Sequence, residues 1–181
     1  ILVANAGFAS VALFEKTSTK LWDKNMDILS KGCFLISREV YQKMIEQNNG
    51  GSIIFVSSKN SLSASKGASA YSVAKSSLLH LSRLIALEGS AYKIRSNVVN
   101  PDAVIQGSKI WKGDWKKQRA ISNKISINNV EEFYKNRSLL KESILPEDIA
   151  EGIYFFASSK SKKSTGNIIN VDGGNITSFT R

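Results

Sequence analysis

The sequence predicts an α/β fold in which helices cover both faces of a doubly wound parallel sheet. Three observations support this class. Four short apolar runs have the composition of buried strands, long segments of helical periodicity separate them, and the runs show no alternation of polar and apolar residues. Continuous apolar strands that alternate with helices are typical of parallel sheets buried on both faces.

The first half of the chain is predicted to hold two strands and two long helices. Residues 1–3 form an apolar run that ends at a turn beginning with Asn5. Apolar positions at helical spacing extend from about residue 21 to 47, and two asparagines followed by two glycines stop that helix. Residues 52–56, rich in β-branched side chains, form the second strand. A helix over residues 68–89 follows a polar loop.

The second half is expected to add two strands, one helix and a long insertion. Residues 94–99 form the third strand, which Pro101 ends. The segment from about 102 to 145 carries two tryptophans and many lysines in short helical stretches, and we interpret it as an insertion. The next helix begins at Pro146, because proline and the acidic residues after it favour a helix N-terminus. Residues 166–171 form the last strand.

Length and composition fit one domain and exclude several classes of site. Among the 181 residues, a single cysteine excludes a disulfide framework, and a single histidine argues against a Ser-His-Asp triad. The net charge of +10 is compatible with a nucleic-acid or membrane partner, but the lysines are spread along the chain and no apolar run can span a bilayer. We therefore expect no nucleic acid, no membrane, no metal site and a cytoplasmic location.

The apolar strand at residues 1–3 predicts that the sheet extends further. A buried parallel strand needs partners on both sides, and four strands make a thin sheet for an α/β fold. We expect the 181 residues to be the C-terminal part of a domain whose first strands lie upstream.

Ser58, Tyr71 and Lys75 are the strongest candidates for catalysis. Tyr71 and Lys75 share a helix face one turn apart, and an ammonium group beside a phenol lowers the pKa of the phenol. Ser58 follows a strand at the carboxyl edge of the sheet, where open α/β folds place their sites. These groups can exchange a proton and hold a substrate oxygen, although a Tyr/Lys pair at this spacing also occurs by chance.

The spacing of these residues resembles that of the short-chain dehydrogenase/reductase family. Twelve residues separate Ser58 from Tyr71 and three separate Tyr71 from Lys75, as in the catalytic signature of that family. The resemblance covers essentially the whole chain and implies a Rossmann-like fold, with the insertion as a substrate loop. Further motifs that resemble the family are Asn5-Ala6-Gly7, Asn100-Pro101-Asp102 and Val171-Asp172-Gly173-Gly174.

The resemblance implies an oxidoreductase that transfers a hydride between a nicotinamide dinucleotide and a small alcohol or aldehyde. Tyr71 would exchange the substrate proton, Lys75 would hold the nicotinamide ribose, and Ser58 would orient the substrate oxygen. NAD is the expected cofactor, and NADP stays open. The expected cofactor-binding residues are Asn5, Ala6, Gly7, Tyr71, Lys75, Pro101, Asp102, Ala103 and Val104.

The expected substrate-binding residues are Ser58, Asn60, Gln106 and Trp111. Asn60 could touch substrate or only stabilise its loop by bonding to backbone, and Trp111 could cover the site or pack inside the insertion. Stretches around Asn60, Trp111 and Pro146 are similar to the dehydrogenase half of bifunctional rhamnulose-1-phosphate aldolase/lactaldehyde dehydrogenases. That similarity implies lactaldehyde as substrate, a role in rhamnose metabolism and an upstream aldolase-type domain.

Three features depart from the family pattern. The glycine-rich phosphate loop and the residue that selects NAD or NADP would lie upstream of Ile1, so the 181 residues are expected to bind dinucleotide poorly. Leu29 occupies the position of an asparagine that usually supports a proton-relay water. Asp102 replaces a glycine and puts a carboxyl group near the expected cofactor site.

Two alternatives about function and assembly stay open at this point. The rival to an enzyme is a non-catalytic fragment or assembly module. The helices at 21–47 and 68–89 carry apolar residues on more than one face, and in the resembled family such helices pair across a two-fold axis. We therefore expect a homo-oligomer, either a dimer or a tetramer.

Overall fold

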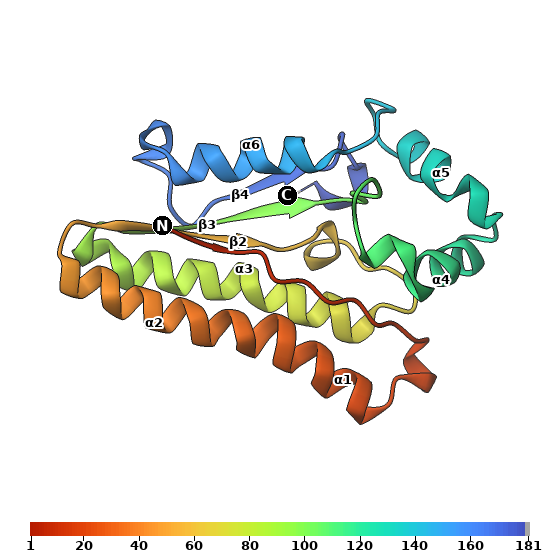
Figure 1. The fold of residues 1–181 in the computed structure, drawn as a ribbon, viewed down its shortest axis with the longest axis horizontal. Coiled ribbons are helices and arrows are strands. Elements are labelled where there is room, and N and C mark those ends of the chain that lie inside the picture. Colours follow the sequence, from red (N-terminus) through yellow and green to blue (C-terminus); the bar gives the residue numbers. More distant parts are fainter. Residues whose placement is uncertain (180–181) are drawn as a thin grey trace.

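The computed structural model describes residues 1–179, and a four-stranded parallel sheet forms its centre (Figure 1). The sheet has the order β1-β2-β3-β4, and each strand pairs in parallel with the next. This confirms the predicted α/β class and the four predicted strands. The strands are β1 (Leu2–Ala4), β2 (Gly51–Val56), β3 (Ile94–Pro101) and β4 (Ile168–Val171).

Helices cover both faces of the sheet, as the sequence predicts (Figure 1). The helix predicted over 21–47 is one continuous rod that begins after Ser18, whose side chain accepts a hydrogen bond from the main-chain N–H of Leu21. It ends at Asn48, which adopts the left-handed conformation with φ 49°. The elements on this face are α1 (Thr19–Asn25), a π-helical segment (Met26–Lys31), α2 (Gly32–Gln47) and α3 (Ser69–Gly89).

The opposite face is covered by α6 (Pro146–Ala157) (Figure 1). Its N-terminus has the predicted proline in the first turn, and the Asp148 carboxylate accepts a hydrogen bond from the main-chain N–H of Leu145 at 2.8 Å. The acidic side chain thus satisfies a donor that the helix leaves free.

The side chains of β2 show why this sheet needs cover on both faces. Ile53 and Phe55 pack into the apolar core under α2 and α3, whereas Ile54 and Val56 pack into the core under α6. All four are buried. Successive strand side chains point to opposite faces, so an unbroken apolar run requires two cores.

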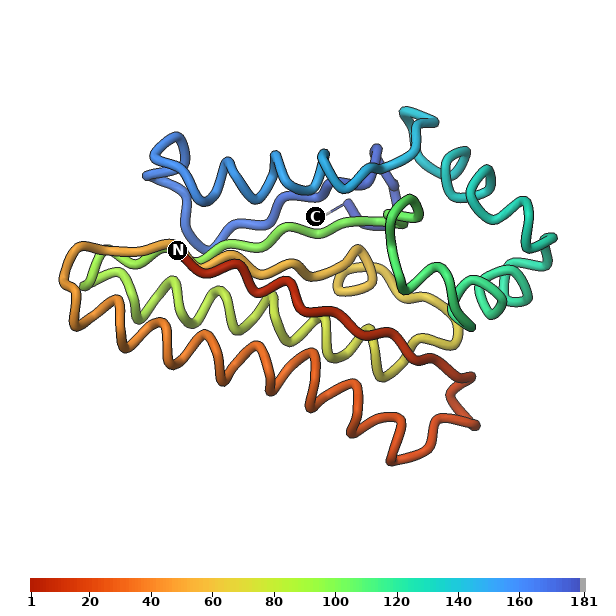
Figure 2. The backbone as a smooth tube through the Cα atoms, viewed as in Figure 1, coloured from red at the N-terminus to blue at the C-terminus, as the bar shows by residue number. Residues whose placement is uncertain are grey.

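The insertion lies beyond the carboxyl ends of the strands (Figure 2). It contains α4 (Asp114–Asn123) and α5 (Val130–Arg137), preceded by a 3-10 turn at Ile110–Lys112. Its own small apolar cluster centres on Trp111, Ala120 and Val130. The insertion is therefore a folded cap at the end of the sheet where ligand sites form.

β1 lies at one edge of the sheet and pairs with β2 alone among the described residues. The side chain of Val3 is 39% exposed there. The expectation of further strands before residue 1 stays a prediction. Within residues 1–179, none of the helices combines the length and the apolar character that crossing a membrane requires.

Candidate active site

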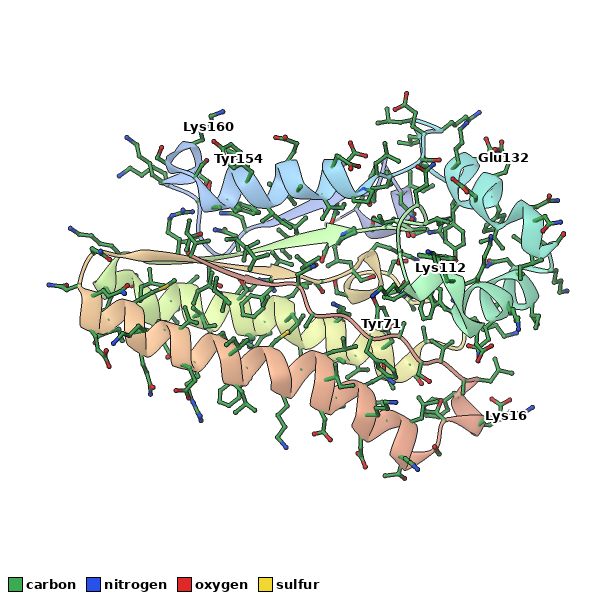
Figure 3. The ribbon with its side chains drawn as sticks, viewed as in Figure 1. Lys16, Tyr71, Lys112, Glu132, Tyr154 and Lys160 are labelled. Carbon is green, nitrogen blue, oxygen red and sulfur yellow. The ribbon has the colours of Figure 1, made fainter. Side chains whose placement is uncertain are left out.

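A cavity of about 570 Å³ opens at the carboxyl ends of the strands. The loops after β1, β2 and β3 bound it, together with the insertion. Figure 3 shows Tyr71 at this end of the molecule, whereas Tyr154 and Lys160 lie near the far end of α6. All predicted site residues line the cavity except Ala6 and Gln106.

Ser58, in the loop that follows β2, and Tyr71, on α3, both line the cavity. Ser58 caps the turn at Lys59–Ser61, and its Oγ accepts a hydrogen bond from the main-chain N–H of Asn60 at 3.2 Å. The Ser58 side chain is also hydrogen-bonded to the Tyr71 side chain. A serine hydroxyl both donates and accepts, so it can serve the loop and the phenol together.

The pKa of Tyr71 moves in the opposite direction from the sequence-based expectation. Burial raises the pKa of the phenol, and the hydrogen bond from Ser58 lowers it by less. Desolvation disfavours the charged phenolate, and this effect outweighs the help from a polar neighbour. The predicted lowering by Lys75 is therefore wrong for the chain in this state.

Lys75 is 4% exposed and lies on α3 one turn after Tyr71. Its Nζ donates a hydrogen bond to the main-chain oxygen of Val56 at 2.8 Å. Burial lowers the pKa of this ammonium group to about 8. A second bond, from Ser57 Oγ to the main-chain oxygen of Lys75 at 2.9 Å, fixes α3 against the end of β2.

Aromatic side chains from the insertion form one wall of the cavity. The ring centres of Tyr71 and Trp115 lie 5.4 Å apart, and those of Trp111 and Trp115 lie 6.2 Å apart. Trp111 also packs against Tyr134, with ring centres 5.1 Å apart. Trp111 thus does both things that the sequence left open, because it packs the insertion and lines the cavity.

Asn60 holds its loop through side-chain contacts rather than through the backbone. Its Oδ1 accepts a hydrogen bond from Ser65 Oγ at 2.7 Å, and Lys59 Nζ donates to the same Ser65 oxygen at 3.1 Å. Asn60 is nearly buried but lines the cavity. Loop support is therefore visible, and substrate contact by Asn60 stays a prediction.

The carboxylate of Asp102 is held by groups from two other parts of the chain. Arg137 Nη2 donates to its Oδ1 at 2.8 Å, and Asn175 Nδ2 donates to its Oδ2 at 2.9 Å. Asp102 thus ties α5 and the C-terminal segment to the end of β3. The negative charge that the sequence placed near the cofactor site is balanced by the Arg137 guanidinium.

The structure does not bring Gln106 or Ala6 to the cavity. Gln106 is exposed, and its Nε2 donates to the carboxylate of Glu131 at 3.2 Å. Ala6 is the middle residue of its turn, and its neighbours Asn5 and Gly7 line the cavity instead.

The proton-relay position is occupied by a residue that cannot form hydrogen bonds through its side chain. Leu29 is fully buried in the π-helical segment. The nearby Asn25 is also fully buried; its Nδ2 donates to the main-chain oxygens of Ser10 and Leu21, and its Oδ1 has no hydrogen-bond partner among the described residues. The altered relay that the sequence predicts is consistent with this packing.

Several polar residues that line the cavity are absent from the predicted site, and Lys59, Arg119 and Tyr134 are among them. Two local signals point to them. Lys59 directly follows Ser58 in the sequence. Arg119 lies four residues after Trp115, so Trp115 and Arg119 share one face of α4. Tyr134 has no comparable local signal, because only the packing of the insertion brings it to the cavity.

Proteins similar to this chain are oxidoreductases. Residues 1–175 match the family described as enoyl-(acyl carrier protein) reductase. The chain is 51% identical over 181 residues to the uncharacterized oxidoreductase YuxG of Bacillus subtilis. This alignment covers 100% of this chain and 26% of YuxG. It is 31% identical over 180 residues to D-erythrulose reductase of Gallus gallus, covering 98% of this chain and 68% of that protein.

A solved structure agrees with these sequence matches. Sorbitol-6-phosphate 2-dehydrogenase SrlD from Erwinia amylovora has a TM-score of 0.89 and 29% identity, over 96% of this chain and 68% of that chain. The chain spans only about a quarter of YuxG. The matched fold, the matched sequences and the Ser58, Tyr71 and Lys75 arrangement lead to one assignment. The chain belongs to the short-chain dehydrogenase/reductase family of oxidoreductases.

Proposed function

We propose that this chain carries the catalytic groups of an oxidoreductase that transfers a hydride between a nicotinamide dinucleotide and a small alcohol or carbonyl compound. The observation that carries the proposal is the convergence of Ser58, Tyr71 and Lys75 on one cavity at the carboxyl edge of the sheet. A proton donor, a hydrogen-bond donor and a buried cation in one pocket are what carbonyl reduction requires.

The walls of the cavity fit the nicotinamide end of a dinucleotide. Gly7 lines the cavity and has no side chain, so a flat ring can approach the backbone closely at this wall. Asn5, Gly7 and the segment from Pro101 to Val104 would hold the nicotinamide, and Lys75 would hold its ribose. When bound, the dinucleotide supplies or accepts the hydride.

Tyr71 is the proton donor in this proposal. Its raised pKa keeps the phenol protonated at neutral pH, which suits delivery of a proton to a carbonyl oxygen. Ser58 is hydrogen-bonded to Tyr71 in the free protein, and with substrate bound its single O–H would turn to the substrate oxygen as charge develops there. Both donors then stabilise the oxygen that becomes a hydroxyl.

Lys75 acts as a cation that orients the reactants. With a pKa of about 8 it is mostly protonated at neutral pH. An ammonium group has three donors, so Lys75 can keep its bond to the Val56 oxygen and still donate to a ribose hydroxyl.

The substrate, the cofactor and the cellular role are proposed for the whole protein. The resemblance to lactaldehyde dehydrogenases suggests lactaldehyde as the first substrate to test, with NAD before NADP. The same resemblance suggests a role in rhamnose metabolism in the cytoplasm and an aldolase-type domain in the same protein. The rival function is a non-catalytic assembly module.

The decisive experiment compares Tyr71→Phe with the unaltered sequence, both in the full-length protein. Nicotinamide absorbance is followed with lactaldehyde and with other small alcohols and aldehydes, using NAD(H) and NADP(H) in turn. Tyr71→Phe keeps the ring that packs on Trp115 but removes the hydroxyl, so turnover should fall by about 100-fold or more while circular dichroism is unchanged. Tyr92→Phe, at an exposed tyrosine, is the matched control. Near-normal turnover in Tyr71→Phe would remove Tyr71 from the catalytic groups, whereas no turnover in the unaltered full-length protein would favour the assembly module.

A further inference from the structure

We propose that Lys59 and Arg119 bind an anionic group of the substrate, a carboxylate or a phosphate, at the end of the cavity that the insertion covers. This inference rests on the proposed function only in that the cavity is taken to be the substrate site. It adds the chemical class of the substrate to that proposal, and it favours an acid or a phosphate ester over lactaldehyde, which carries no anionic group.

Both cations are almost completely buried, yet both line the cavity. Lys59 is 6% exposed and Arg119 is 4% exposed. Removing a cation from water is costly unless an anion or several acceptors replace the water. Two such cations in one cavity therefore indicate a ligand of opposite charge.

Neither cation has an ion-pair partner among residues 1–179. The nearest carboxylates are already engaged by other groups. Asp102 is paired with Arg137, and Asp172 accepts hydrogen bonds from the main-chain N–H groups of Gly174 and Asn175. The charges of Lys59 and Arg119 are thus left for a ligand.

The guanidinium of Arg119 has a donor without a partner. Its Nη2 donates to the main-chain oxygen of Lys66 at 2.7 Å, and the side chain is hydrogen-bonded to Tyr134. Its Nε is buried and has no hydrogen-bond partner within the described part of the chain. A buried donor left unpaired costs free energy, which an oxyanion in the cavity would recover.

The position of the cations suits a substrate whose other end is at Tyr71. Both groups contact Trp115, since the Tyr71 ring centre lies 5.4 Å and the Arg119 Cζ lies 5.1 Å from the centre of its ring. A small molecule that passes over this one indole can place its hydroxyl or carbonyl at Tyr71 and its anionic group at Arg119. Small hydroxy acids and phosphorylated alcohols are the two sources of such a group.

Lys59 has the electrostatic surroundings of an anion site. Burial lowers the pKa of its ammonium group, and the nearby Arg137 and Arg119 lower it further, against the opposing effect of Asp102 and Asp172. Burial is the largest cause of the lowered pKa, so the ammonium group lacks solvation that an anion in the cavity could replace. An anion bound there would relieve both the repulsion and the desolvation.

A direct binding titration tests the inference without any turnover. Inorganic phosphate and acetate are added in turn at constant ionic strength, and the fluorescence of Trp111 and Trp115 is followed in a Trp22→Phe background. We expect a saturable change with at least one of the two anions, which identifies phosphate or carboxylate as the preferred group. Arg119→Gln and Lys59→Met should each weaken that binding at least 10-fold. Arg83→Gln and Lys112→Met, which remove exposed cations outside the cavity, should not.

Two results would overturn the inference. One is the absence of a saturable change with both anions, and the other is equal anion affinity in the cavity variants and the controls. If Arg119→Gln is unstable by thermal unfolding, Arg119→Lys and Lys59→Met carry the test. A purely structural role for Arg119 would lower stability while leaving anion affinity in the folded protein unchanged.

A kinetic arm separates this inference from the proposed function. For a matched pair of substrates, one with a carboxylate and one with a hydroxymethyl group in its place, Arg119→Gln should raise KM at least 10-fold for the acid alone. Equal changes for both substrates would argue against anion recognition but would leave hydride transfer established. Anion binding without turnover would support anion recognition and argue against the proposed hydride transfer.

Discussion

The ammonium group of Lys75 donates a hydrogen bond to the main-chain oxygen of Val56, the last residue of β2, at 2.8 Å. This bond joins the helix that carries Tyr71 to the strand that leads into Ser58. The residue thought to hold the cofactor therefore also holds the site together. Its burial carries a cost in stability that can be measured.

That cost predicts a pH-dependent stability. Burial lowers the pKa of Lys75 from 10.5 to about 8, so between these values the unfolded chain binds the proton and the folded chain does not. Stability should rise with pH across this window, by about 3 kcal/mol at most from this group. Below pH 8 the folded chain must keep the buried charge.

Denaturant unfolding at several pH values from 7 to 10 measures this effect. In Lys75→Met the contribution of Lys75 should be lost, so the rise should be smaller, with buried Lys59 still contributing; Lys31→Met, at an exposed lysine, should retain the full rise. Parallel stability curves for Lys75→Met and the unaltered protein would contradict the assignment.

Ser58→Ala should shift the titration of Tyr71 upward. The hydrogen bond from Ser58 lowers the pKa of the phenol, so its loss leaves burial unopposed and raises that pKa further. Alcohol oxidation needs the phenolate, and its alkaline activation should therefore move to higher pH. Turnover should also fall by about 10² to 10³-fold if Ser58 stabilises the substrate oxygen.

The control for this shift is Ser63→Ala, which removes a hydroxyl bonded to Thr177 outside the cavity. Ultraviolet titration of tyrosinate, together with pH profiles of kcat/KM, gives the readout. An unchanged profile in Ser58→Ala would separate Ser58 from the proton transfer.

The Asp102 and Arg137 pair should stabilise the insertion. Asp102→Asn removes the charge that accepts two hydrogen bonds from Arg137 and one from Asn175, and should cost about 1–3 kcal/mol. Chemical denaturation of Asp102→Asn, Arg137→Gln and the double variant gives the coupling energy. Strictly additive losses would show that the two side chains act independently.

Exposed apolar side chains on α2 and α3 predict self-association. Leu35, Ile36, Val73 and Leu87 are all more than two-fifths exposed, and Leu87 reaches 73%. Large apolar side chains left exposed on the long helices are a feature of association surfaces. Sedimentation equilibrium at micromolar concentration should show a dimer or tetramer.

Leu87→Asp should shift this equilibrium toward monomers. Ile121→Asp changes a residue that is 77% exposed on α4 and should have no effect on assembly. A monomer for the unaltered protein would contradict the prediction.

The regular elements could be predicted because their signals are local. Apolar runs placed all four strands, and the Asn48 stop and the Pro146 start fell where the structure has them. The insertion was harder, because α4 and α5 are short and polar and owe their place to the packing of Trp111 with Val130. Their boundaries therefore came only from the structure.

The sequence by itself determined the parallel α/β arrangement and the candidates Ser58, Tyr71 and Lys75. Hydrophobic periodicity and the spacing of these three residues can both be seen in short stretches of the chain. Only the tertiary structure decided the surroundings of these groups. It showed that burial raises the pKa of Tyr71, and that Arg119 from the insertion reaches the cavity beside Lys59. Desolvation and charge balance depend on segments that are distant in the chain, and no local pattern records which of them will meet.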